Sequence, residues 1–211
     1  MDSSVLAFTG VAALMTISPG PDMALMLRNV LRAGQPVVLP TALGIITGLA
    51  VWAVASAVGI ATLVATSTEA YASLRLVGGA YLAGLGLVAL RHAARPHAGS
   101  RRQASTAPAA VELNRSGAFR LGLLTNVTNP KVGVFYATLL PQFIPTGAPV
   151  LGTSLLLAGI HALLGIAWLT LYGTALSRLG TALSDGPARR VLEGITGIVL
   201  LALGARVAIE A

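Results

Sequence analysis

Two short polar motifs interrupt otherwise apolar stretches of this sequence, and they contain the residues best suited to chemistry. The first is Ser-Pro-Gly-Pro-Asp at 18–22, and the second is Thr-Asn-Val-Thr-Asn-Pro-Lys at 125–131. Proline removes a backbone donor and glycine adds flexibility, so a continuous helix through the first motif would be incompletely hydrogen-bonded. We therefore expect a helix break at each motif. Pro19, Gly20, Pro21 and Pro130 are candidate site residues for this reason.

The two motifs also carry charged and amide side chains. Asp22 is the one carboxylate inside the first apolar stretch, and Lys131 is the only lysine of the chain. An isolated charge at the centre of a bilayer costs at least about 2.5–3.5 kcal/mol, so such residues are usually functional. With Asn126 and Asn129 they are candidates for binding a substrate or a proton. The alternative is that Asp22 caps a helix and Lys131 extends to the membrane surface.

Asn129 directly precedes Pro130, a pattern typical of a helix N-cap followed by proline at the first helical position. His161 lies within another apolar stretch, where a hydrogen bond between helices and a role in a transport pathway are equally good interpretations. Trp52 and Trp168 are interpreted as packing residues or interface anchors. No cluster of His, Asp and Glu has metal-ligand spacing, and no Ser/His/Asp set or phosphate-binding loop is present, so we expect no metal, no cofactor and no enzymatic activity.

The elements that must position these residues are membrane spans. The chain has 211 residues, of which 55% are hydrophobic and 10% charged, against roughly a quarter charged in soluble domains. Several apolar stretches exceed the roughly 18–20 residues that cross the hydrocarbon core. We predict an all-α polytopic membrane protein of about six transmembrane helices, with the first and fourth broken. The expected spans are 4–27, 37–64, 71–90, 117–143, 150–177 and 191–209.

Basic residues alternate along the connections between these spans. The formal net charge of +7 would suggest nucleic acid in a soluble protein, but here the arginines lie between apolar stretches, and we expect no nucleic-acid partner. Under the positive-inside rule, the arginine-rich connections are cytoplasmic, which places both termini outside and requires an even number of spans. The first connection carries Arg28 and Arg32. The third carries Arg91, Arg95, Arg101, Arg102, Arg115 and Arg120, and the fifth carries Arg178, Arg189 and Arg190.

The stretch 93–114 reads as a flexible cytoplasmic linker that divides one transporter domain, 1–211, into half-repeats of about 1–92 and 115–211. The segment 39–53 is weakly similar to 155–169, with a glycine pair and a late tryptophan in each. A repeat of three spans enters the membrane in opposite senses, which is the inverted-repeat plan of many secondary transporters. In this alignment, Asp22 and Lys131 begin equivalent half-helices.

The motif Pro-Gly-Pro-Asp-Met at 19–23, continuing to Leu-Arg-Asn at 27–29 and Gly44, closely resembles a signature of the LysE/RhtB family of amino-acid exporters. The stretch from Gly122 through Asn129-Pro130-Lys131 to Phe143 is similar to that family's second signature. The resemblance covers essentially the whole chain. A related group of thiol-disulfide electron carriers has cysteines in the two broken spans, and this chain has no cysteine.

The resemblance implies a bacterial inner-membrane exporter of amino acids or close derivatives, driven by proton exchange, with membrane lipid around it. The residues that match positions of the two signatures are Asp22, Asn126, Asn129, Pro130 and Lys131. His161 matches the family's pattern more loosely. Two rivals stay open: an exporter of another small solute or cation, and a membrane scaffold without transport activity. The sequence leaves open which amino acid is carried and whether the chain forms a homo-oligomer.

Overall fold

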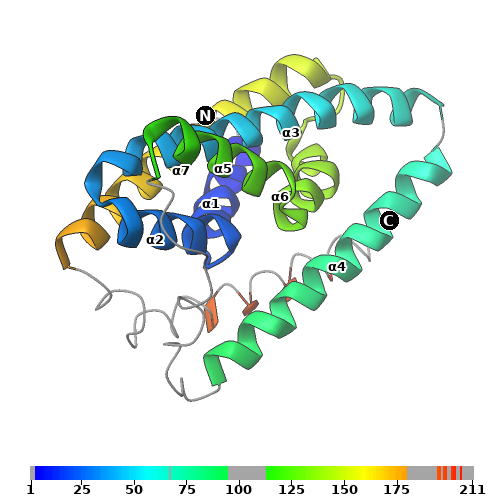
Figure 1. Ribbon diagram of the computed structural model, residues 1–211. Coiled ribbons are helices and arrows are strands. Elements are labelled where there is room, and N and C mark those ends of the chain that lie inside the picture. The colour runs from blue at the N-terminus through cyan, green and yellow to red at the C-terminus, as the bar shows by residue number, and fades with distance from the viewer. Residues whose placement is uncertain are drawn as a thin grey trace.

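The computed structural model describes residues 3–66, 68–94 and 113–179, together with 194–195, 197–198, 201–202 and 205. Every secondary-structure element among these residues is helical, as Figure 1 shows. The predicted all-α class is therefore confirmed.

The first expected span is broken where the first motif lies. Helix α1 (Ser3–Ile17) ends before the Ser-Pro-Gly sequence, and helix α2 (Pro21–Ala33) starts with its proline. The two helices are bent by 44° relative to each other. Gly20 is the N-cap residue and supplies no side-chain cap, while Asp22 lies in the first turn of α2. The break is thus confirmed, and Asp22 does not act as the helix cap.

The fourth expected span is broken at the second motif. Helix α5 (Arg115–Val127) ends there, and helix α6 (Pro130–Val134) follows after two residues. The side chain of Asn129 accepts a hydrogen bond from the Lys131 backbone N–H at 3.1 Å, which confirms the predicted cap. The span continues as a π-helical turn, η3 (Phe135–Leu139), and a 3-10 turn, η4 (Leu140–Phe143). Such π-helical turns are frequent at functional sites.

Three long helices complete the described structure. A 3-10 turn, η1 (Gln35–Val37), leads into α3 (Val38–Thr66), which is followed by α4 (Thr68–Ala94) and later by α7 (Val150–Leu179). The segments Gln35–Gly59 and Val150–Arg178 are long and apolar enough to cross a membrane, and the bent pair α1 and α2 counts as a third span.

These segments match the expected first, second and fifth spans, and α4 covers the expected third as a helix. Most of 191–209 and of the linker 93–114 lies outside the described residues. The count of six spans and the inverted repeat stay predictions.

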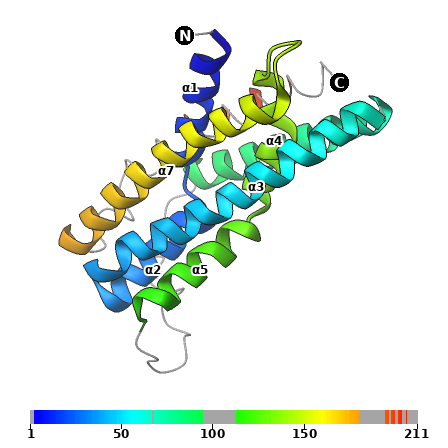
Figure 2. The ribbon, with the colours of Figure 1, turned by 90° about the horizontal axis from the view of Figure 1, so that it is seen from above.

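Helix α3 lies between α5 and α7, and Figure 2 shows the three running side by side. Glycines allow the close approach to α5. A methyl group added at Gly44 would overlap the Phe119 carbonyl oxygen, and one added at Gly122 would lie 2.5 Å from the Thr41 carbonyl oxygen. At Gly48 an added methyl would lie 2.8 Å from the Asn126 Cβ. The small residues of α3 thus bring the end of α5 to the centre of the bundle.

Two apolar clusters flank that centre. The first contains Phe8 and Met15 of α1 with residues of η3, α3 and α7, and the second contains Met26 and Val30 of α2 with other residues of α3 and α7. The break between α1 and α2 therefore lies between two well-packed regions.

The close contact between α3 and α5 gives a stability prediction. Gly44→Ala should lower the free energy of unfolding by about 1–3 kcal/mol or more, because the methyl group meets backbone atoms that cannot move aside easily. The measurement is the apparent melting temperature of purified protein in detergent. Gly159→Ala in α7 is the control, since no described atom lies within 4 Å of its added methyl. Equal melting temperatures for the two variants would contradict the prediction.

Candidate functional site

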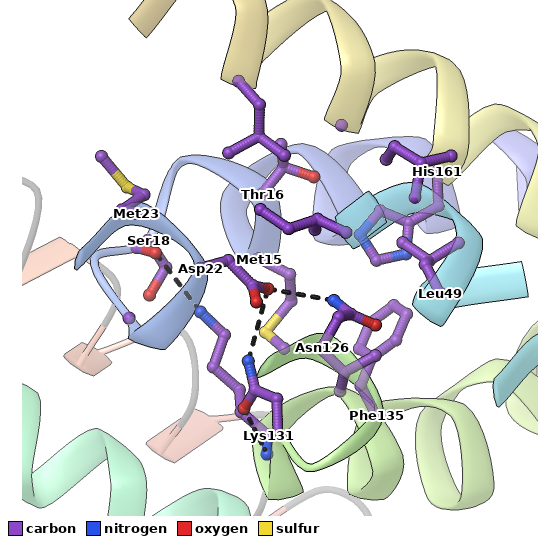
Figure 3. Close-up of a pocket in the computed structure, with 17 residues that line it drawn as sticks. Met15, Thr16, Ser18, Asp22, Met23, Leu49, Asn126, Lys131, Phe135 and His161 are labelled. Carbon is purple, nitrogen blue, oxygen red and sulfur yellow. Dashed lines mark hydrogen bonds between the residues drawn. The ribbon is translucent and has the colours of Figure 1, made fainter. Parts of the chain in front are cut away.

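One cavity of about 50 Å³ lies where the two helix breaks meet (Figure 3). It is lined by residues of α1, α2, α3, α5, α6, η3 and α7, so both halves of the chain contribute. The predicted site residues that line it are Gly20, Asp22, Asn126, Asn129, Lys131 and His161. The prolines at 19, 21 and 130 are absent from that lining, and they shape the breaks instead.

The Asp22 carboxylate is held by amides from the other half of the chain. Asn126 Nδ2 donates to Asp22 Oδ2 at 3.0 Å, and Asn129 Nδ2 donates to the same oxygen at 3.3 Å (Figure 3). Asn126 and Asn129 are buried, and Asp22 is mostly buried. A carboxylate removed from water needs such donors, because an unpaired buried charge is costly. The two bonds therefore join the first break to the second.

Lys131 makes the reverse connection between the breaks. Its Nζ donates to the Ser18 carbonyl oxygen at 3.3 Å, and that carbonyl lies in the stretch between α1 and α2. Gly20 leaves room for the ammonium, since a methyl group added there would lie 3.4 Å from Nζ. Lys131 therefore points inward, which contradicts the alternative that it extends to the membrane surface.

Trp52 of α3 supports the second break from the side. Its Nε1 donates to the Asn126 carbonyl oxygen at 3.3 Å, and that oxygen also accepts from the Asn129 backbone N–H. A methyl group added at Gly133 would lie 2.7 Å from the indole ring, so the ring packs directly on α6. The packing interpretation of Trp52 is confirmed. Its hydrogen bond to Asn126 depends on how two helices pack, which the sequence pattern does not indicate.

His161 enters the cavity from α7. Its ring lies parallel to that of Tyr136, with Nδ1 3.3 Å from the Tyr136 hydroxyl oxygen. The interhelical hydrogen bond expected for His161 is thus present, and the residue also lines the cavity. Trp168 does not share this place: it stacks on Tyr172 with 6.2 Å between ring centroids.

Several oxygen atoms around the cavity are buried and have no hydrogen-bond partner in the described structure. Asp22 Oδ1, Asn126 Oδ1 and Thr16 Oγ1 belong to cavity-lining residues. Buried polar atoms without partners are rare and call for an explanation. Carboxylate and amide oxygens accept from an ammonium, and the Lys131 ammonium can donate to a carboxylate. The cavity thus offers complementary groups for both charges of a zwitterion.

The sequence did not single out Thr16 or the apolar walls of the cavity. Thr16 lies two residues before the first motif, and its threonine side chain gives no signal that it differs from other helical threonines. Leu49 and Phe135 also line the cavity but resemble ordinary core residues in the sequence. Among the described residues, no group of three or more His, Cys, Asp or Glu side chains could hold a metal ion.

Comparisons with known proteins show which family the chain is similar to. A family model described as LysE type translocator matches residues 13–211. An uncharacterized membrane protein, YrhP, of Bacillus subtilis is 29% identical over 202 residues, which are 95% of this chain and 96% of that protein.

Two relatives carry functional names. A homoserine/homoserine lactone efflux protein of Salmonella typhimurium is 27% identical over 96% of this chain and 94% of its own length. A threonine efflux protein of Escherichia coli is 31% identical over 66% of this chain and 65% of its own length. No solved structure matches the chain.

The two tryptophans give a prediction about the second break. Trp52→Phe removes the donor to the Asn126 carbonyl and also the outer ring atoms near Gly133, so it should lower the free energy of unfolding by at least about 0.5–1.5 kcal/mol. Trp168→Phe is the matched control, because the Trp168 indole N–H is buried without an acceptor. We expect it to be neutral or stabilising. Thermal unfolding of both variants in detergent tests this, and equal destabilisation would refute the assigned role of Trp52.

Proposed function

The chain belongs to the LysE type translocator family, and on that premise we propose that it exports an amino acid or a close derivative across the bacterial inner membrane. Family members named for efflux of homoserine, homoserine lactone and threonine support an amino-acid cargo. The family consists of translocators, and the proposed activity is transport rather than enzymatic catalysis.

The observation that carries this proposal is the reciprocal bonding of the two breaks. Asp22 of the first break is bonded to Asn126 and Asn129 of the second, and Lys131 of the second is bonded to Ser18 of the first. Irregular backbone inside apolar spans is tolerated where it is packed against protein or lines a wet cavity. Two polar breaks in corresponding spans are the usual pointer to a transport site.

The binding mode follows from the charges of the site. We place the substrate ammonium at the free Asp22 Oδ1 and Asn126 Oδ1. The substrate carboxylate faces the Lys131 ammonium, which can donate to it. The two breaks are shaped by Pro19, Gly20, Pro21, Asn129 and Pro130. His161 closes the cavity from α7.

Proton coupling has a simple basis at the same carboxylate. An ammonium and a proton compete for Asp22, so a proton arriving from outside displaces the amino acid, and an amino acid from the cytoplasm displaces the proton. One proton then enters for each amino acid that leaves. The oxygen that bonds to neither Asn126 nor Asn129 is the exchange position.

We further propose that the chain is one domain of six spans, built from inverted halves at about 1–92 and 115–211. Each half supplies one broken span, and access to the cavity alternates between the two sides of the membrane. The positive-inside rule supports cytoplasmic first, third and fifth connections and termini that both lie outside.

Export of amino acids tests the proposed function. Cells that produce the protein and are loaded with dipeptides should release the derived amino acids faster than cells without it. Asp22→Asn should slow release about tenfold or more, because a charge-assisted bond of about 1.5–3 kcal/mol is lost. It should also remove the dependence of release on external pH.

The control is Thr47→Val, since the Thr47 hydroxyl bonds to its own helix at Leu43 on the exposed side of α3. Unchanged release by Asp22→Asn at every pH would refute proton coupling at this residue. No release of any amino acid by the unmodified protein would refute the cargo. Resistance to metal salts or other solutes would then support the rival exporter, and unaltered phenotypes for both Asp22 and Asn129 variants would support a scaffold.

The topology can be mapped by single cysteines, because the chain has none of its own. Ser3→Cys, Thr146→Cys and a cysteine added after Ala211 should react with a membrane-impermeant maleimide in intact cells. Ser116→Cys should react only after permeabilisation, because it adjoins the arginine-rich third connection. Ser3, Ser116 and Thr146 are exposed, so accessibility reports the side of the membrane. Opposite labelling of the two termini would refute the even number of spans.

A further inference from the structure

Thr16 behaves differently from four other threonines in the described helices and at their ends. Threonine in a membrane helix ordinarily donates its hydroxyl to the carbonyl three or four residues earlier. This bond is made by Thr9 to Val5, Thr47 to Leu43, Thr128 to Leu124 and Thr138 to Val134. Thr16 lies near the end of α1, and its Oγ1 is buried without any partner.

The position of Thr16 connects this hydroxyl to the cavity. The residue lines the same cavity as Asp22, Asn126 and Lys131, and it lies two residues before the first break (Figure 3). Three buried oxygens without partners belong to residues of this one cavity. The free oxygens of Asp22 and Asn126 suit the ammonium of a substrate, so the Thr16 hydroxyl remains for another polar group of that substrate.

The remaining walls restrict what that group can be. Leu49 of α3, Phe135 of η3 and Leu169 of α7 present apolar surfaces, and Gly165 keeps α7 close to α3, since its added methyl would lie 2.7 Å from Ile46. Asp22 is the one carboxylate among the described residues that line the cavity. A cationic side chain therefore lacks a second counter-charge there, and the close packing of α7 on α3 at Gly165 favours small side chains.

We infer that Thr16 is a specificity-determining residue, whose hydroxyl bonds to the hydroxyl of a small, uncharged substrate side chain. The inference rests on the proposed function, because it assumes that an amino acid occupies the cavity. A hydroxyl group can both donate and accept a hydrogen bond, so the two hydroxyls can bond to each other with either one as the donor. A substrate without the hydroxyl leaves the Thr16 oxygen buried and unpaired.

The test compares substrates that differ only by a hydroxyl group. Release of L-serine is measured against L-alanine, and release of L-homoserine against L-2-aminobutyrate, from loaded cells at matched internal concentrations. The unmodified protein should favour the hydroxylated member by about 2- to 10-fold, as expected for one net hydrogen bond. Thr16→Val, which has nearly the same shape, should bring this ratio close to one while alanine release persists.

Two further variants make the result specific to this hydroxyl. Thr16→Ser retains the hydroxyl and should retain most of the preference. Thr9→Val lies on the same helix but removes a hydroxyl that bonds to its own backbone, so its ratio should equal that of the unmodified protein. Protein amounts in the membrane are compared for all variants, and the ratio of two substrates in one variant is independent of that amount.

The outcomes separate this inference from the proposed function. An unchanged ratio in Thr16→Val, a ratio lost in Thr16→Ser, or an equal loss in Thr9→Val overturns the role of Thr16 while amino-acid export stands. If Thr16→Val does not accumulate, Thr16→Ala, which also lacks the hydroxyl, takes its place, and an unchanged ratio in that variant overturns the role of Thr16. No release of any of the four amino acids by the unmodified protein overturns the proposed function itself.

Discussion

The structure depends on one constraint, the burial of the Asp22 carboxylate inside an apolar bundle. A carboxylate there needs donors, and the two that bond to it come from Asn126 and Asn129, more than a hundred residues away in the chain. These donors reach Asp22 only if the end of α5 lies against the centre of the bundle. Gly44 and Gly122 make that approach possible, because any larger side chain would meet backbone atoms of the facing helix. The bonds from Asn126 and Asn129 to Asp22 therefore depend on glycine at these two positions of the interface between α3 and α5.

The broken spans impose a second requirement, which is that freed backbone groups must find partners. The Ser18 carbonyl accepts from Lys131, the Asn126 carbonyl accepts from Trp52, and the Lys131 N–H donates to the Asn129 side chain. The freed backbone groups of each break therefore bond to side chains from other elements, and the second break is also capped by its own Asn129 side chain. These hydrogen bonds explain why irregular backbone persists in segments that are otherwise apolar.

Local rules predicted the breaks but not their partners. The Ser-Pro-Gly-Pro and Asn-Pro sequences disfavour a continuous helix, so the ends of α1 and α5 and the Asn129 cap could be predicted from the sequence. The bond from Trp52 to Asn126 depends on how two helices pack, and tryptophan in an apolar stretch has many other uses. Thr16 is a stronger example, because Thr9 and Thr16 both lie in the apolar helix α1, yet only Thr9 bonds to its own helix. The difference lies in the cavity that tertiary packing creates.

The apolar clusters suggest which parts would move if access to the cavity alternates. Helices α3 and α7 contribute to both clusters, whereas α1 belongs to one and α2 to the other. A rotation of α1 against α2 at residues 18–20, where the backbone is already bent by 44°, would therefore have to separate one of these two helices from α3 and α7. Lys131 donates to the Ser18 carbonyl in this joint, so a substrate carboxylate that binds the Lys131 ammonium competes with a contact that holds the joint. Binding and opening are then coupled through Lys131.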